Sequence, residues 1–102
     1  MKFERRTIAG DIRLDYDLTL YGTVTGSVTV VEDGFLLLYG TCNQNVILEN
    51  KSKAYIYGTV VGNALNNGGY LEIYGTINGF VKTSNEGKTK IDPKAVIRKA
   101  LQ

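Results

Sequence analysis

The tripeptide Tyr-Gly-Thr occurs four times in this chain of 102 residues, and it returns at nearly constant intervals. The four copies begin at Tyr21, Tyr39, Tyr57 and Tyr74, so they are separated by 18, 18 and 17 residues. A repeat this short cannot bury an apolar face by itself, and it becomes stable only when successive copies stack on one another. The spacing therefore predicts a solenoid.

Within each copy, apolar residues alternate with polar ones and do not follow a helical spacing. The recurring apolar positions are Leu18, Leu20, Val24, Val28 and Val30, then Leu36, Leu38, Cys42, Val46 and Leu48, with corresponding residues in the next two copies. A period of two indicates strands with one buried face. Glycines such as Gly22, Gly40 and Gly58 interrupt the strands, and we expect them to adopt the positive φ that corners often need. We predict one all-β domain, a single-stranded β-helix of about five triangular coils of about 18 residues.

The boundaries follow from where the pattern starts and stops. Residues 1–17 are predicted to form an N-terminal cap and a partial coil, because Ile8, Ile12 and Leu14 match positions of the first repeat. Residues 18–88 hold the four repeats. Residues 89–102 are predicted to form a C-terminal cap, with the tail covering the open end as a strand or a short helix. Asn66 occupies a position that is mostly aliphatic in the other copies. Its amide either satisfies the backbone of a tight corner or contacts a ligand, and both interpretations are open.

The composition argues against enzymatic chemistry. The chain has no histidine, which removes the most common general base and the most common zinc ligand. Its one cysteine, Cys42, belongs to an apolar series, so we interpret it as a small buried hydrophobe. The period of 18 is three times six, as in hexapeptide-repeat acyltransferases, but those enzymes typically use a histidine base. We therefore predict a non-enzyme with no catalytic, metal-binding or cofactor-binding residues.

Other features limit the partners that we expect. A net charge of +2 is too small to indicate a nucleic-acid partner. No apolar run approaches the ~20 residues of a membrane-spanning helix. The charged N-terminal residues are not followed by an apolar stretch, so we expect a cytoplasmic protein. A column of outward threonines is also compatible with ice binding, but the neighbouring column mixes threonine, asparagine and valine.

One lateral face carries the candidate functional residues. In a stacked coil the four repeated tyrosines form an outward column, and a second and a third outward column run beside it. Exposed tyrosines favour protein interfaces because they bury a large rigid ring and keep a polar tip. The predicted protein-binding residues are Tyr21, Leu37, Tyr39, Tyr55, Tyr57, Tyr70 and Tyr74. The partner is another protein, for example a toxin blocked by an immunity protein, or a second copy of the chain. Stacking that only stabilises the coil is the alternative.

The two ends of the solenoid differ in charge. Residues 1–34 hold four basic and six acidic residues, whereas residues 82–102 hold six basic and two acidic residues. This asymmetry fits either solubility of the two caps or head-to-tail contact between molecules.

The repeated string 20–28, with its Tyr-Gly-Thr-Val-Thr-Gly rhythm, and its copies at 57–63 and 74–79 resemble the bactofilin family of polymer-forming bacterial proteins. The resemblance covers roughly residues 8–92. It implies a right-handed β-helix that stacks end to end into filaments without a nucleotide. Bactofilins usually carry proline-containing disordered tails, and this chain has a single proline, Pro93, followed by a segment that resembles a cap.

Overall fold

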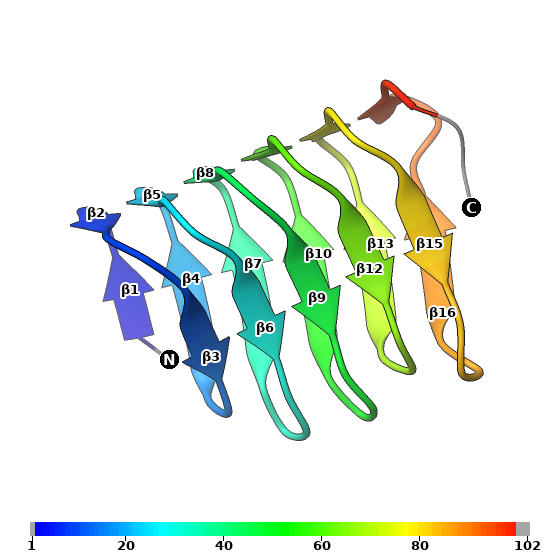
Figure 1. Cartoon of the computed structure of the whole chain (residues 1–102), viewed down its shortest axis with the longest axis horizontal. Helices are drawn as coiled ribbons and strands as arrows, with labels where there is room; N and C mark the ends of the chain where they lie inside the picture. The colour runs from blue at the N-terminus through cyan, green and yellow to red at the C-terminus, as the bar shows by residue number, and fades with distance from the viewer. Residues whose placement is uncertain (1, 100–102) are drawn as a thin grey trace.

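The computed structural model describes residues 2–99 as short β-strands in three parallel sheets that run the length of the molecule (Figure 1). Sheet A contains β1 (Lys2–Glu4), β4 (Asp17–Leu20), β7 (Phe35–Leu38), β10 (Lys53–Ile56), β13 (Tyr70–Ile73) and β16 (Lys88–Ile91). Sheet B contains β2 (Thr7–Ile8), β5 (Thr23–Val24), β8 (Thr41–Cys42), β11 (Thr59–Val60), β14 (Thr76–Ile77) and β17 (Val96–Ile97). Sheet C contains β3 (Ile12–Leu14), β6 (Val28–Val30), β9 (Val46–Leu48), β12 (Ala64–Asn66) and β15 (Val81–Thr83).

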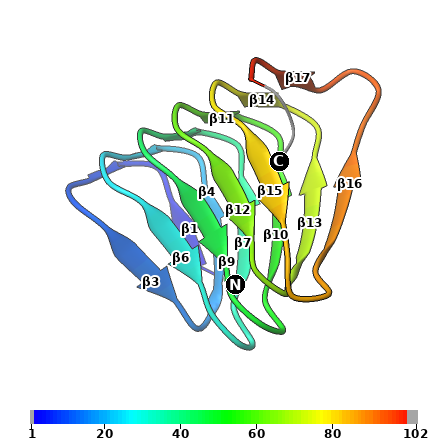
Figure 2. The same ribbon diagram turned by 45° about the vertical axis from the view of Figure 1, so that its right-hand side comes forward.

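Each coil visits sheets A, B and C in turn, and each strand pairs with the equivalent strand of the coils before and after it (Figure 2). The predicted β-solenoid of about five coils is therefore confirmed. The first coil is more complete than the sequence indicates, because β1 pairs with β4 and adds the missing sheet A strand. At the other end sheet C stops at β15, while the tail adds β17 to sheet B as a strand. Residues 100–102 lie outside the described part of the chain.

The core consists of the inward columns that the alternation predicts. Leu18, Leu36, Ala54 and Leu71 follow one another in register along sheet A, and all four are buried. Cys42 lies in the sheet B column between Val24 and Val60 and has no exposed surface. Its interpretation as a small core residue is confirmed. Because the strands of one sheet are about 4.8 Å apart, equivalent side chains of adjacent coils are in contact along the whole core.

The glycines of the Tyr-Gly-Thr repeat are needed for a different reason from the one expected. Among the described residues, only Gly10 and Gly68 are glycines with positive φ. A Cβ on Gly58 would instead overlap the carbonyl oxygen of Gly40 and lie 2.6 Å from that of Tyr39. Gly40 and Gly75 meet the preceding coil in the same way. Close approach between stacked backbones, not a left-handed conformation, therefore excludes a side chain at this corner.

A column of polar side chains holds the corner between sheets B and C. Asp11 accepts a hydrogen bond from the backbone N–H of Ser27 at 2.8 Å, and Ser27 Oγ accepts one from the N–H of Asn45 at 3.1 Å. Asn45 and Asn63 continue the pattern toward the C-terminus, with distances of 2.9 Å and 3.0 Å. Each side chain thus satisfies a backbone donor of the next coil where no strand pairing does so.

The described residues form a body with principal extents of 30, 25 and 21 Å. None of the described segments is a helix long and apolar enough to span a bilayer.

Candidate protein-binding face

The seven predicted site residues all lie on the outer face of sheet A or at its corner with sheet B. We call them the tyrosine face: Tyr21, Leu37, Tyr39, Tyr55, Tyr57, Tyr70 and Tyr74. Register pairing places Leu37 beside Tyr55, and Tyr70 one column away from them. The fold therefore brings the seven residues together. Whether they contact a partner remains a prediction.

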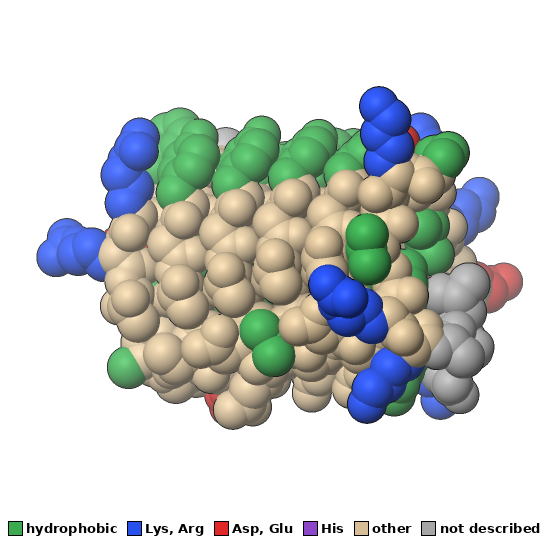
Figure 3. All heavy atoms as spheres, turned by 90° about the horizontal axis from the view of Figure 1, so that it is seen from above, with side chains coloured by type: hydrophobic (Ala, Val, Ile, Leu, Met, Phe, Trp, Pro, Cys, Tyr) green, Lys and Arg blue, Asp and Glu red, His purple; other side chains and the backbone are tan. Residues whose placement is uncertain are grey.

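The repeated tyrosines form a continuous stack along the corner between sheets A and B. The ring centroids of Tyr21 and Tyr39 are 5.2 Å apart, those of Tyr39 and Tyr57 5.0 Å, and those of Tyr57 and Tyr74 4.9 Å. The planes of each pair differ by at most 10°. Each such pair contributes about 0.5–1.5 kcal/mol beyond its buried area. A row of hydrophobic side chains is visible along one long edge in Figure 3, beside a broad surface with few charged side chains.

The stack extends beyond the predicted residues at its N-terminal end. The ring of Phe3 stacks on Tyr21 with a centroid distance of 6.4 Å, and Phe3 is 62% exposed. The guanidinium of Arg5 lies 4.9 Å from the centroid of the Tyr21 ring, within the range of a cation–π contact. Phe3 and Arg5 were not predicted to belong to the face, because they precede Ile8, the first position matched to the repeat.

The inner part of the face is packed against itself. The ring of Tyr55 meets Phe35 and Tyr70 edge to face, at centroid distances of 5.3 and 6.4 Å. Leu37 and Tyr55 are half-buried, so they leave less apolar surface bare than the sequence indicates. The most exposed residues of the face are Tyr21, Tyr39 and Tyr57, at 43%, 45% and 41%. An incoming surface would therefore meet the corner stack first.

Glu72, which was not among the predicted site residues, fixes the C-terminal end of the face. The hydroxyls of Tyr70 and Tyr74 both donate to the Glu72 carboxylate, the first at 2.5 Å. These hydrogen bonds, with Lys90 and Lys53 nearby, lower the pKa of Glu72. The same bond raises the pKa of Tyr74 to about 12. The available signal was alternation, which puts Tyr70 and Glu72 on the outer side of β13 and Tyr74 on the same side just after the strand.

Replacing Glu72 by Gln is expected to change the titration of the tyrosines. The carboxylate favours the protonated phenol, so Glu72→Gln should bring the pKa of Tyr74 down toward its ordinary value of about 10. Since the folded state lowers the pKa of Glu72, its stabilising effect is present above the unfolded pKa and is lost as the pH falls through the folded pKa. The difference in unfolding free energy between wild type and variant should therefore shrink on acidification.

Tyrosinate absorbance during alkaline titration, and urea unfolding across the acidic range, test this expectation. Glu49→Gln is the matched control, because Glu49 is exposed and lies away from the tyrosines. An identical alkaline titration for wild type and Glu72→Gln would contradict the assignment.

Few other groups in the described residues have unusual chemistry. Among residues 2–99, no group of three or more His, Cys, Asp or Glu side chains is arranged to hold a metal ion. Burial raises the pKa of the Cys42 thiol, which lies 3.4 Å from the carbonyl oxygens of both Gly26 and Asn45. A thiol held protonated in this way is a poor nucleophile.

Asn66 is satisfied within the chain. Its Nδ2 donates to Lys88 O at 2.9 Å and to Thr89 Oγ1 at 3.0 Å, and its Oδ1 accepts from the N–H of Gly69 at 2.8 Å. The structural interpretation of this amide is confirmed, because both its nitrogen and its oxygen have hydrogen-bond partners within the protein.

In comparisons with known proteins, the chain matched no family, no curated sequence and no solved structure. The parallel coils of about 18 residues are compatible with a short-coil β-helix family, and the comparisons do not name one.

Proposed function

We propose that this protein is a non-enzymatic, cytoplasmic binding protein whose tyrosine face engages another protein. The observation that carries the proposal is the corner stack, in which three tyrosines remain more than two-fifths exposed although their rings are fixed by one another. Rings that are already ordered lose little side-chain entropy when a partner covers them. Tyrosine is also among the residues that most often carry interface energy.

A rigid binding surface suits a protein that inhibits its partner by covering it and does not modify it chemically. The parallel strands fix the spacing of the rings, so the face presents one shape to any partner. Pre-organised surfaces of this kind bind with little backbone change. We therefore extend the proposal to an inhibitor or immunity role, in which the tyrosine face covers the active surface of a toxin.

Substitution of two ring positions is expected to remove partner binding without unfolding the protein. Tyr39→Ser with Tyr57→Ser deletes the middle of the stack, and the matched control is Ile47→Ser with Leu65→Ser, two half-buried outward positions of the same coils on sheet C. Affinity capture from the native lysate should recover a specific protein with the wild type and the control, and lose it with the tyrosine variant. Equal recovery by all three baits would show that the tyrosine face has only a structural role.

End-to-end self-assembly, as in bactofilins, is the second candidate function. The strands β1, β2 and β3 at one end, and β15, β16 and β17 at the other, each pair on one side only. Open parallel edges at both ends favour the stacking of one molecule on the next.

Electron microscopy and sizing at several salt concentrations separate the two candidates. Filaments that lengthen with protein concentration would support end-to-end assembly. A discrete species at every concentration would count against it and leave the binding role.

A further inference from the structure

The corner between sheets C and A separates its charges along the molecule. Residues 14–50 contain five acidic residues and no lysine or arginine. All five lie in or next to the turns that join sheet C to sheet A, and all are exposed: Asp15, Asp17, Glu32, Asp33 and Glu49. From residue 51 onward the same corner carries the exposed basic residues Lys51, Lys53 and Lys88, with Glu86 among them. We call this edge the turn corner.

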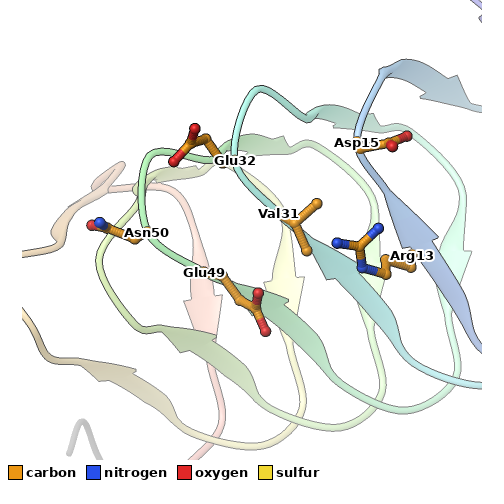
Figure 4. Close-up of a pocket in the computed structure, with 6 residues that line it drawn as sticks. All are labelled: Arg13, Asp15, Val31, Glu32, Glu49 and Asn50. Carbon is orange, nitrogen blue, oxygen red and sulfur yellow. The ribbon is translucent and has the colours of Figure 1, made fainter.

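Each half of the turn corner contains a shallow hollow. The acidic half has one of about 330 Å³, lined by the carboxylates of Asp15, Glu32 and Glu49, with Arg13, Val31 and Asn50 completing it (Figure 4). The basic half has one of about 310 Å³, where three lysines and one carboxylate lie around Tyr70 and the glycines of the adjacent turn: Lys51, Lys53, Lys88 and Glu86. The two hollows thus have opposite charge and similar size.

Within residues 2–99 these charges have no ion-pair partners. The described residues form one ion pair, Arg6 with Glu4 at 3.7 Å, and it lies on the N-terminal coil away from the turn corner. Lys53 Nζ lies 5.9 Å from the centroid of the Phe35 ring, and its charge also acts on Glu72 without forming an ion pair with it. Carboxylates and ammonium groups of one edge are therefore available to an outside partner.

We propose that two copies of this chain associate side by side and antiparallel along their turn corners. A two-fold axis across the corner brings the acidic half of each copy against the basic half of the other. Such an interface is isologous, so one complementary contact is made twice. Lys53 and Lys88 of one copy then face the carboxylates of Glu32 and Glu49 of the second copy.

The surrounding surface suits a second copy. The outward column next to the turn corner reads Asp17, Phe35, Lys53, Tyr70 and Lys88 from one end to the other. Its two rings lie between charged groups and would be covered as the charges meet. A long side of a body of 30 by 25 by 21 Å offers somewhat less than the roughly 800 Å² per partner of a standard interface. The pair is thus expected to be weak and salt-sensitive.

A nucleic acid fits this corner less well than a protein surface. Single strands bind through bases that stack on free ring faces. Here the ring of Tyr70 is engaged edge to face with Tyr55, and its hydroxyl is held by Glu72. The acidic half of the corner would also repel phosphates. The dimer would cover Tyr70 of the tyrosine face but leaves the corner stack of Tyr39 and Tyr57 outside the contact, so the two proposals can be tested separately.

Sedimentation equilibrium of the purified chain at about 0.02 M and about 0.5 M NaCl is the first test, because added salt screens charge pairs at an exposed interface. We expect a monomer–dimer equilibrium whose dissociation constant is about tenfold or more higher at the higher salt concentration. A monomer at all concentrations, or a dimer indifferent to salt, would overturn the proposal.

Charge reversal supplies the sharper test, since it makes a prediction for mixtures. Glu32→Lys with Glu49→Lys places positive charge in the acidic half, and Lys53→Glu with Lys88→Glu places negative charge in the basic half. All four positions are exposed and have negative φ, so both variants should fold. Each variant alone should be monomeric at low salt, while an equal mixture of the two should form a heterodimer.

The matched control is Lys94→Glu with Lys99→Glu, which changes the net charge by the same amount as the acidic variant but lies away from the turn corner. It should dimerise like the wild type. Failure of the mixture to associate, or loss of the dimer in this control, would rule out the antiparallel contact. Binding of a single-stranded oligonucleotide to the wild type with the same charge dependence would assign the basic half to nucleic acid instead.

Discussion

Gly58→Ala is expected to destabilise the fold by about 4 kcal/mol or more, which is exceptional for a single methyl group. The added Cβ would overlap the carbonyl oxygen of Gly40 and press on that of Tyr39. Both are backbone atoms of the preceding coil, so no rotamer change relieves the contact, and the coils must separate. Separation would break the backbone bonds from Gly58 and Thr59 to Leu38 and Gly40, at 2.9 and 3.0 Å. The loss approaches the whole stability of a small domain.

Gly10→Ala is the matched control, because it isolates the conformational effect of a glycine. Gly10 has a φ of 85°, and a Cβ there would meet nothing within 4 Å. The expected cost is about 1–2 kcal/mol for a left-handed alanine, partly offset by the roughly 0.4–1 kcal/mol that alanine gains by restricting the unfolded chain. Urea unfolding followed by circular dichroism measures both variants. A loss at Gly58 no larger than that at Gly10 would show that the coils can move apart easily.

The repeat predicted the architecture because a period near 18 and a period of two within it allow few other folds. Each inward column, including the one with Cys42, followed from alternation alone. The N-terminal strand β1 was harder to predict, since Lys2 and Glu4 occupy its inward positions at the open end and break the apolar pattern. The register of β1 is therefore set by backbone pairing with β4 of the next coil and not by burial of apolar side chains.

The reason for the repeated glycines could not be deduced from the sequence. A glycine at a corner is compatible both with positive φ and with close approach of two backbones, and only coordinates distinguish these possibilities. The polar column from Asp11 to Asn63 was missed for a related reason. Its members differ in type and share only the ability to accept a backbone N–H, so no residue repeat marks them. Their spacing of one coil was the signal that remained.

The candidate face was predicted as a set of residues but not as a surface. Alternation gave the outward positions, and the coil gave their columns. It gave no measure of how far neighbouring rings cover one another, which depends on their rotamers. The ring of Tyr55, for example, meets Phe35 and Tyr70 edge to face. The Glu72 carboxylate likewise lies between the hydroxyls of two tyrosines. Burial of outward residues by their own neighbours is a property of packing that a binary pattern does not contain.

Asn66→Leu tests whether the last full turn is held by polar contacts or by packing, and we expect a loss of about 2–3 kcal/mol. The preceding coil has Leu48 at the same position, so leucine fits the column in size and hydrophobicity. It cannot replace the bonds to Lys88 O and Thr89 Oγ1, and it leaves the buried N–H of Gly69 without its acceptor.

The cost of that unsatisfied donor should exceed the gain from burying an aliphatic side chain where Asn66 has no exposed surface. Urea unfolding gives the loss, and faster amide exchange at Gly69 would locate it in the turn 66–69. Asn67→Leu is the control, because Asn67 is exposed and its Oδ1 accepts only from Ser84 Oγ at the surface. If Asn66→Leu were as stable as the wild type, the amide would be dispensable, and packing of the last coils alone would hold the C-terminal end.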